Sequence, residues 1–338
     1  KGYSNIVEML LAVDGVQVNQ AQENGWTPLK FACENGHSKV VTMLLAVDGI
    51  QVNLADVDGR TPLTVACQNG HSKVVKMLLA VDGIQVNQAT NFGWTPLDVA
   101  CLNDRSKVVN MLLAVDGIQV NLANNHGSTP LNIACQYGNS KVVEMLLAVD
   151  DIQVNQADSE GTTPLNIACQ YGNSKVVEML LAVDDIQVNQ ADSGGTTPLN
   201  VACQYGNSKV VEMFLAMLLA VDGILVNQAK HNGWTPLHFA CRNGHLKIVE
   251  MLLTVDGIQV NQATNNGDTP LNFACQQGHS KVVKMLLAVD GIQANQANNN
   301  GFTPLMVAVD RSHIDIAIQL FQLGIGHNNT NEWFHINK

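Results

Sequence analysis

Hydrophobic and polar positions recur along this chain with a period of 34 residues. A Thr-Pro-Leu triplet is followed closely by Ala-Cys and is preceded by Val-Asn-x-Ala, three variable residues, a glycine and one more variable residue. Successive triplets lie 34 residues apart, except for one step of 38; they start at Thr27, Thr61, Thr95, Thr129, Thr163, Thr197, Thr235, Thr269 and Thr303. A fixed period of this length indicates stacked repeats rather than the two separate domains that the length alone would suggest.

Each copy predicts two short helices joined by a turn. Thr27 can cap a first helix that begins at Pro28, where the missing N–H costs nothing. Leu29, Ala32 and Cys33 then share one apolar face of that helix. Because one such helix pair cannot bury its apolar surfaces alone, neighbouring copies must cover it on both sides.

A glycine should end the first helix, and a second amphipathic helix should follow. Gly36 is the predicted break, and Gly49 has the place of a left-handed C-terminal cap for the second helix. Residues 52–59, polar and turn-rich, fit an extended hairpin that leads into the next triplet. The predicted apolar face of the second helix consists of Val40, Val41, Leu44 and Leu45.

One copy, residues 233–245 (GWTPLHFACRNGH), resembles the ankyrin repeat nearly residue for residue. The resemblance extends over residues 1–326 and implies an all-α repeat solenoid, an ankyrin-repeat stack of helix-turn-helix units with short β-hairpin-like loops. The chain departs from the family in its period, which is 34 where 33 is usual. It also lacks the usual histidine after the triplet everywhere except at His238.

The repeat boundaries follow from the triplets. The expected units are a partial repeat at 1–21, full repeats at 22–55, 56–89, 90–123, 124–157, 158–191, 192–229, 230–263 and 264–297, a C-terminal capping repeat at 298–326, and a loose tail at 327–338. The unit 192–229 contains four additional residues, for which we expect a longer second helix or a bulged loop. The capping assignment rests on Ser312 in place of the usual glycine and on Val309 in place of cysteine.

Composition and charge exclude several classes of protein. The chain has 18 Lys and Arg against 29 Asp and Glu, a net charge of −11, which argues against nucleic-acid binding. Its longest apolar run, residues 213–221, is half of what a membrane span needs, so no membrane insertion is expected. Because the sequence begins with lysine, we interpret it as a piece of a longer polypeptide.

Candidate catalytic chemistry is absent from the sequence. The eight cysteines occupy equivalent positions in successive copies, and helices stacked about 8–10 Å apart are too distant for disulfides. Buried, reduced cysteines favour an intracellular, cytoplasmic protein. No Cys-x-x-Cys pair, phosphate loop or hydrolase motif occurs, and His37, His71, His245 and His279 are interpreted as turn residues. We therefore expect no enzyme activity, metal, cofactor or small-molecule substrate.

The positions that vary between copies are the candidate binding surface. By the resemblance, they are hairpin-tip residues and exposed first-helix residues on a concave face. They contain half of the chain's aromatic residues, which are common binding hot spots. The candidate partner-binding residues are Trp26, Arg60, Phe92, Trp94, Tyr137, Tyr171, Tyr205, Trp234, Arg242 and Phe302. Phe31, Phe239 and Phe273 are instead assigned to the core.

The predicted function is that of a non-catalytic protein–protein interaction module or scaffold. Its partner is an unknown protein, and a neutral to basic one would suit the acidic chain. Two alternatives stay open: a structural spacer or elastic arm in a larger protein, and substrate-recruiting repeats of an enzyme whose catalytic domain lies outside residues 1–338.

Overall fold

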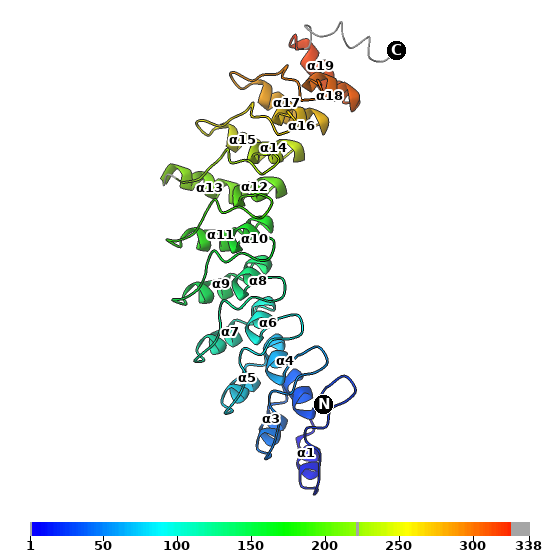
Figure 1. Cartoon of the computed structure of the whole chain (residues 1–338), viewed down its shortest axis with the longest axis vertical. Coiled ribbons are helices and arrows are strands. Elements are labelled where there is room, and N and C mark those ends of the chain that lie inside the picture. The colour runs from blue at the N-terminus through cyan, green and yellow to red at the C-terminus, as the bar shows by residue number, and fades with distance from the viewer. Residues whose placement is uncertain (1, 221–222, 326–338) are drawn as a thin grey trace. The chain divides into compact units, whose positions relative to one another are not determined.

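The chain is an all-α repeat solenoid. The computed structural model describes residues 2–220 and 223–325, and these residues form nineteen helices and no strand. First and second helices alternate along the chain, and the two helices of each copy are packed as a pair (Figure 1). The loose tail expected at 327–338 lies outside the described residues.

The first helices begin at the proline of each triplet. They are α2 (Pro28–Glu34), α4 (Pro62–Asn69), α6 (Pro96–Leu102), α8 (Pro130–Tyr137), α10 (Pro164–Gln170), α12 (Pro198–Tyr205), α14 (Pro236–Asn243), α16 (Pro270–Gln276) and α18 (Pro304–Asp310). The second helices are α1 (Ser4–Leu11), α3 (Ser38–Leu45), α5 (Ser72–Leu79), α7 (Ser106–Leu113), α9 (Ser140–Leu147), α11 (Ser174–Leu181), α13 (Ser208–Ala220), α15 (Leu246–Leu253), α17 (Ser280–Leu287) and α19 (Ile314–Gln322).

The predicted caps are present at the start of the first helices, but one predicted C-cap is wrong. The hydroxyl of Thr27 accepts a hydrogen bond from the backbone N–H of Lys30 at 3.2 Å. Gly49 does have a left-handed φ of 76°, yet α3 ends at Leu45 and its C-cap, Ala46, is right-handed. The glycine instead serves the turn that follows, because the Val-Asp-Gly segment folds back after the helix has already ended.

The inter-helix glycines are needed for two reasons at once. Gly70 caps α4 with a left-handed φ of 74°. A Cβ added there would also lie 2.7 Å from the Arg105 side chain of the next copy. The same position in the copy before, Gly36, faces His71 equally closely. The glycines therefore allow a side chain of the next copy to approach closely, and Asp104 and Ser312 adopt the same left-handed φ at the equivalent positions of two other copies.

The described chain divides into two compact units. One contains residues 1–164 and 182–186, and the other contains residues 165–181 and 187–338. Within the first unit, α4 packs against both α2 and α6; within the second, α14 packs against both α12 and α16. The Leu, Ala and Cys of each first helix supply this interface, and all eight cysteines are buried as predicted. Burial raises the pKa of the Cys33 thiol to about 12, so this thiol stays protonated and unreactive.

Asparagines of the Val-Asn pair join neighbouring copies outside the core. The Asn53 side-chain N–H donates to the carbonyl of Gly83 at 2.8 Å, and its oxygen accepts from the backbone N–H of Gln85 at 3.0 Å. The same pair of bonds forms at Asn19, Asn87 and Asn121 in the first unit and at Asn189, Asn227 and Asn261 in the second. We call these residues the asparagine ladder; the sequence showed their recurrence but not their partners.

The four additional residues lengthen a helix, which was one of the two expected outcomes. Helix α13 has 13 residues, whereas α11 has 8. Phe214 is fully buried at the core position that Leu180 occupies in α11. The insertion therefore extends the helix beyond its neighbours without changing the register of its packed face.

The last described helix carries apolar residues on both of its sides. Ile316 and Leu320 of α19 are buried, whereas Ile314 is 67% exposed and Phe321 is 53% exposed. Ser312 adopts the left-handed φ of 61° that glycine has in other copies. A capping repeat should present a polar outer side, so the capping role of residues 298–326 stays a prediction.

Replacing one residue of the asparagine ladder should destabilise the first unit. Asn121→Ala removes a bond of 2.8 Å to the carbonyl of Asp151 and one of 2.9 Å from the N–H of Gln153. We expect a loss of about 0.5–1.5 kcal/mol in the free energy of unfolding, measured by urea denaturation, because two exposed backbone groups exchange their bonds to Asn121 for bonds to water. Gln119→Ala, at an exposed side chain whose backbone bond to Asn87 is kept, is the control; equal losses in the two variants would contradict the role of the ladder.

Candidate functional site

The candidate surface consists of the hairpin tips and the C-terminal ends of the first helices. Each tip is a tight turn rather than the extended hairpin that the sequence suggested. In the first full copy, the N–H of Gln22 donates to the carbonyl of Trp26 at 3.0 Å, and the N–H of Gly25 donates to that of Gln22 at 2.9 Å. Gly25 has a φ of 80°, and a Cβ there would lie 2.7 Å from the backbone of Asp56 in the next tip. Neighbouring tips therefore touch through their backbones.

Hydrogen bonds hold these tips in place. In the first unit, the backbone N–H of Asn91 donates to the backbone carbonyl of Asp58 at 2.9 Å. Its side-chain N–H donates to the backbone carbonyl of Val57 at 2.8 Å. Asn125 repeats the side-chain bond to Asn91 at 3.0 Å. In the second unit, Asn265 and Asn299 make the same pair of bonds to the tip before them. Within each unit, these hydrogen bonds fix the backbone from which the side chains of the tips project.

Five of the predicted binding residues are exposed aromatics. Tyr137, at the end of α8, is 55% exposed, and Phe92, on a tip of the same unit, is 62% exposed. Tyr171, Tyr205 and Phe302 are exposed in the second unit. The amide of Gln170 donates to the Tyr205 hydroxyl at 3.4 Å, which joins adjacent copies at this surface. Rigidly held aromatic side chains of this kind are suited to burying a partner's surface.

The three tryptophans are half-buried. The Trp26 ring lies 4.7 Å from Phe31, and the Trp234 ring lies 4.4 Å from Phe273 and 5.2 Å from Phe239. Two of these indoles therefore fill the space between a tip and the first helices. The assignment of Phe31 to the core is wrong, because this ring is 38% exposed; Phe239 and Phe273 are buried as predicted.

The two predicted arginines stack on the tryptophans but have different surroundings. Arg60 lies 5.9 Å from the Trp26 ring, yet it also bonds Asp56 at 3.0 Å and Asp58 at 2.8 Å. The guanidinium of Arg242 lies 5.0 Å above the Trp234 ring and its residue is exposed. Arg242 thus keeps its charge accessible at the surface, whereas Arg60 is used in an internal network.

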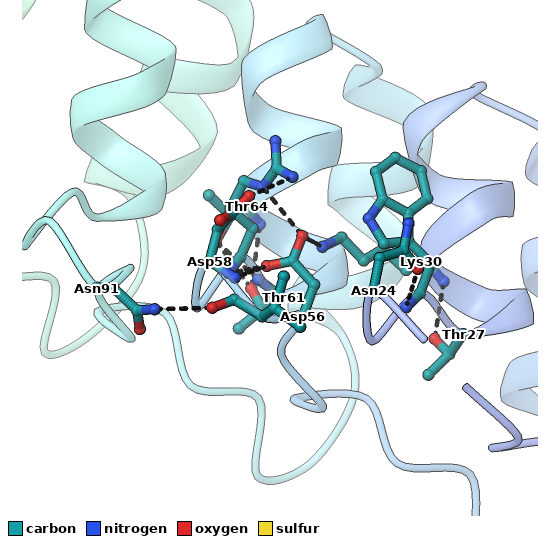
Figure 2. A network of polar contacts seen from close by, with 11 residues as sticks. Asn24, Thr27, Lys30, Asp56, Asp58, Thr61, Thr64 and Asn91 are labelled. Carbon is teal, nitrogen blue, oxygen red and sulfur yellow. Dashed lines mark hydrogen bonds and ion pairs between the residues drawn. The ribbon is translucent and has the colours of Figure 1, made fainter. Parts of the chain in front are cut away.

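That network, centred on a buried ion pair, was not found from the sequence. Figure 2 shows Lys30 of α2 reaching across to Asp56 of the following tip. Both side chains are completely inaccessible to solvent. Asp56 also accepts the backbone N–H of Arg60 at 2.8 Å and that of Asp58 at 3.0 Å. The ammonium of Lys30 lies 4.9 Å from the Trp26 ring, so it is held between a carboxylate and an indole.

Burial and pairing act against each other on these two charges. Loss of hydration lowers the pKa of Lys30 despite the opposing effect of Asp56. Burial would raise the pKa of Asp56, but the hydrogen bond from Lys30 and those from the Arg60 backbone outweigh it and hold that pKa below its usual value. Each charge of the pair therefore depends on the other for its stabilisation.

Lys30 occupies a buried position that differs in chemistry from copy to copy. At the third residue of α8, Asn132 accepts the Thr129 hydroxyl at 2.5 Å and donates to the carbonyl of Thr162 at 3.3 Å. His238 occupies the same position in α14. Its Nδ1 accepts a hydrogen bond from the backbone N–H of Thr235 at 3.1 Å, and its Nε2 donates to the backbone carbonyl of Asp268 at 3.2 Å. Burial lowers the pKa of His238 to about 4, so it is neutral at pH 7.

Asp98 occupies that position in α6 and is only partly hydrogen-bonded there. One carboxyl oxygen accepts the N–H and the hydroxyl of Thr95, both at 2.8 Å. The other is buried without a hydrogen-bond partner. Burial raises the pKa of Asp98 to about 7, even though the bonds from Thr95 act to lower it. This carboxyl group changes charge near neutral pH inside the core.

Two histidines in the described part of the chain bond backbone carbonyls of the preceding copy. His71 bonds the carbonyl of Glu34 at 2.8 Å, and His245 bonds that of Gln204 at 3.1 Å, so these histidines do satisfy backbone groups, as interpreted from the sequence. No group of three or more His, Cys, Asp or Glu side chains there is placed to hold a metal ion. Within residues 2–220 and 223–325, none of the helices has the length and apolar character needed to cross a bilayer.

A family model described as ankyrin repeats, in three copies, matches the chain in seven overlapping blocks. They cover residues 1–90, 49–124, 80–158, 116–192, 150–222, 185–264 and 256–331. The matches extend through both compact units and include every predicted binding residue. Among curated proteins, no sequence matches the chain.

Breaking the buried ion pair should have an asymmetric effect. Asp56→Asn leaves Lys30 as a buried charge without a counter-ion, and we expect a loss of about 3–5 kcal/mol in the free energy of unfolding. Lys30→Asn should cost much less, because Asn132 and Asp158 already form that combination in another copy. The double variant should recover most of the stability lost in Asp56→Asn. Urea denaturation of all three variants tests this, and equal losses in the two single variants would refute it.

The stability of the first unit should fall as pH rises through the range of Asp98. Folded Asp98 keeps its proton up to about pH 7, whereas the unfolded residue loses it near its ordinary pKa of 3.8. Between these values the unfolded state gains free energy of ionisation, so stability decreases as pH rises. Asp98→Asn should be more stable than the natural chain at pH 8 by a few kcal/mol, on the order of 2–4, with no difference near pH 4.

Urea denaturation at pH 4, 6 and 8 measures this difference. Asn132→Asp is the matched control, because it places a carboxyl group at the equivalent position of α8 and should create the same loss of stability with rising pH. Parallel pH profiles for the natural chain and Asp98→Asn would contradict the assignment.

Proposed function

Since the chain belongs to the ankyrin-repeat family, we propose that it is a non-catalytic protein-binding module whose hairpin tips and first helices bind a partner protein. Ankyrin repeats are generally protein–protein interaction modules, and the family is typically non-catalytic. The proposal adds the binding face and the residues that carry it.

The exposed aromatic residues carry this proposal. Tyr171 and Tyr205 are each half exposed at equivalent positions of consecutive copies in the second unit, and Tyr137 is half exposed at the same position in the first unit. Tyr137 and Tyr205 are the last residues of α8 and α12, whose N-termini are capped by Thr129 and Thr197, and Tyr171 directly follows α10. Within each unit, a partner can therefore bury these rings without first ordering the backbone beneath them, which lowers the entropic cost of binding.

The net charge of the chain favours one class of partner protein. The chain has a net charge of −11, so a partner with a neutral to basic surface meets an attractive field as it approaches. The guanidinium of Arg242, accessible beside Trp234, would donate hydrogen bonds to one carboxylate of the partner in such an interface. The binding surface thus combines aromatic burial with one defined cationic contact.

Affinity enrichment with the natural chain and with a variant tests whether the exposed tyrosines bind the partner. The natural chain and the triple variant Tyr137→Ser, Tyr171→Ser, Tyr205→Ser are used to retain proteins from a lysate of the source organism. The affinity of each retained protein is then measured by calorimetry. We expect binding of the true partner to fall by at least about tenfold in the variant, because aromatic hot spots often contribute more than 1 kcal/mol each.

Three exposed lysines on the second helices of the same copies provide the matched control. Lys141→Ser, Lys175→Ser, Lys209→Ser changes the other helix of each pair and should leave the affinity unchanged. Equal retention by the tyrosine variant and the natural chain would place binding elsewhere. Retention of nothing specific by either would instead favour the role of a spacer arm.

A further inference from the structure

A buried oxygen of Asp98 lies where another copy places a hydrogen-bond donor. In α16, the side-chain oxygen of Asn272 accepts the N–H of Thr269 at 3.1 Å, and its Nδ2 donates to the carbonyl of Phe302 at 3.4 Å. In α6, Oδ2 of Asp98 accepts the N–H of Thr95 at 2.8 Å in the same way, and Oδ1 is the atom without a partner. Because aspartate and asparagine have the same shape, Oδ1 occupies the place of Nδ2 and faces a carbonyl oxygen.

The carbonyl that Oδ1 faces is that of Ser128. In the next copy, Asn132 donates at 3.3 Å to the carbonyl of Thr162, which lies 30 residues further along the chain. Ser128 lies 30 residues beyond Asp98, and its carbonyl accepts the N–H of Asn124 at 3.0 Å within the same kind of turn. Two acceptor oxygens therefore oppose each other, and a proton on the carboxyl group turns this contact into a hydrogen bond.

The surroundings of Asp98 do not compensate a negative charge. Among the described residues, ionisable groups lie on α6 itself, on α4, α7 and α8, which pack against it, and on the tip that ends at Ser128. They are Cys67, Cys101, Lys107, His126, Cys135 and Tyr137. The lysine, the histidine and the tyrosine are exposed, and burial raises the pKa of the three thiols, which stay neutral. An ionised Asp98 would thus be a buried charge against the dipole of a carbonyl group.

The tip that ends at Ser128 is bonded to the tip before it. The N–H of Asn125 donates to the carbonyl of Phe92 at 3.1 Å, and its side-chain amide donates to that of Asn91 at 3.0 Å. Phe92 is 62% exposed and is one of the predicted binding residues. Movement of the tip away from an ionised Asp98 would break both bonds.

We propose that Asp98 and the carbonyl of Ser128 form a binding site for one proton, and that this proton holds the tip 124–128 against the tip that carries Phe92. With the proton on Oδ1, the carboxyl group donates to Ser128 as the amide of Asn132 donates in the next copy. Without the proton, the tip separates and the carboxylate is hydrated. Any effect on partner binding rests on the proposed function, whereas the order of the tip does not.

The order of this tip should decrease as pH rises from about 5 to 7. The closed tip keeps the proton up to about pH 7, because burial raises the pKa of Asp98 to that value. A hydrated Asp98 loses its proton near the ordinary pKa of 3.8. Between these values, each pH unit favours the open tip by about tenfold, and above pH 7 the effect levels off because both states are ionised.

Amide hydrogen exchange of the full chain at about pH 5 and pH 7 measures this order, with each rate divided by that of an unstructured peptide at the same pH. In the natural chain, we expect the protection of the Asn125 amide to fall by at least about tenfold. In Asp98→Asn, whose side chain donates at either pH, this protection should stay constant. The Asn91 amide, which donates to Asp58 at 2.9 Å in the preceding pair of tips, is the internal control and should be unchanged in both chains.

A second variant moves the proton site by one copy. Asp98→Asn combined with Asn132→Asp should leave Asn125 constant and make the Ser159 amide, which bonds the tip before it at 3.0 Å, the one that loses protection with rising pH. The proposal is overturned if Asn125 and Asn91 lose protection together, which indicates general unfolding. It is also overturned if the natural chain and Asp98→Asn behave alike, or if the pH dependence does not move with the carboxyl group. No partner takes part, so the outcome is independent of whether the chain binds a protein.

Discussion

Packing of each first helix against the first helices of neighbouring copies is the constraint on which the described structure depends. Most of its helices have seven or eight residues, too few to be stable alone, so packing between copies supplies their stability. Leu63, Ala66 and Cys67 are fully buried in this way. Each inter-helix glycine then lets a neighbour approach, and each tip is fixed by the tip beside it. The packed first helices position the tips, and the first helices and tips together position the exposed aromatic residues.

The third residue of the first helix differs between copies, although the backbone around it is nearly the same. The threonine of the triplet is buried in every described copy, and the residue two positions after the proline is buried in all of these copies except the last, where Met306 is partly exposed. Asn132 and His238 satisfy the site with neutral groups on both sides. Lys30 needs Asp56 as its counter-ion. Asp98 has no such partner for one of its oxygens. Stability therefore varies locally along a chain whose backbone barely changes.

The repeat, its helix pairs and its buried cysteines could be predicted from the sequence because they depend on spacing within one copy. The partners of Lys30 and of the asparagine ladder could not, because they lie 26 to 36 residues away and their approach is set by the stacking geometry. The exposure of Phe31 was missed for a related reason. Its pattern marks it as a core residue, but α2 packs against one first helix, α4, whereas α4 packs against both α2 and α6. Trp26 and Trp234 were recognised as unusual, although half of each is used in packing.

The hydrogen bonds of the asparagine ladder also have a direction. Asn53 bonds backbone groups that lie 30 and 32 residues further along the chain, and Asn189, before the four-residue insertion, bonds groups 34 and 36 residues further along. During synthesis, each copy thus leaves the ribosome before the groups that complete it, and a ribosome needs roughly two to seven seconds to add 34 residues at about 5–20 residues per second. Folding therefore trails translation by one copy. The nascent chain exposes one incomplete edge at a time, whatever its length, which limits the apolar surface open to misassembly.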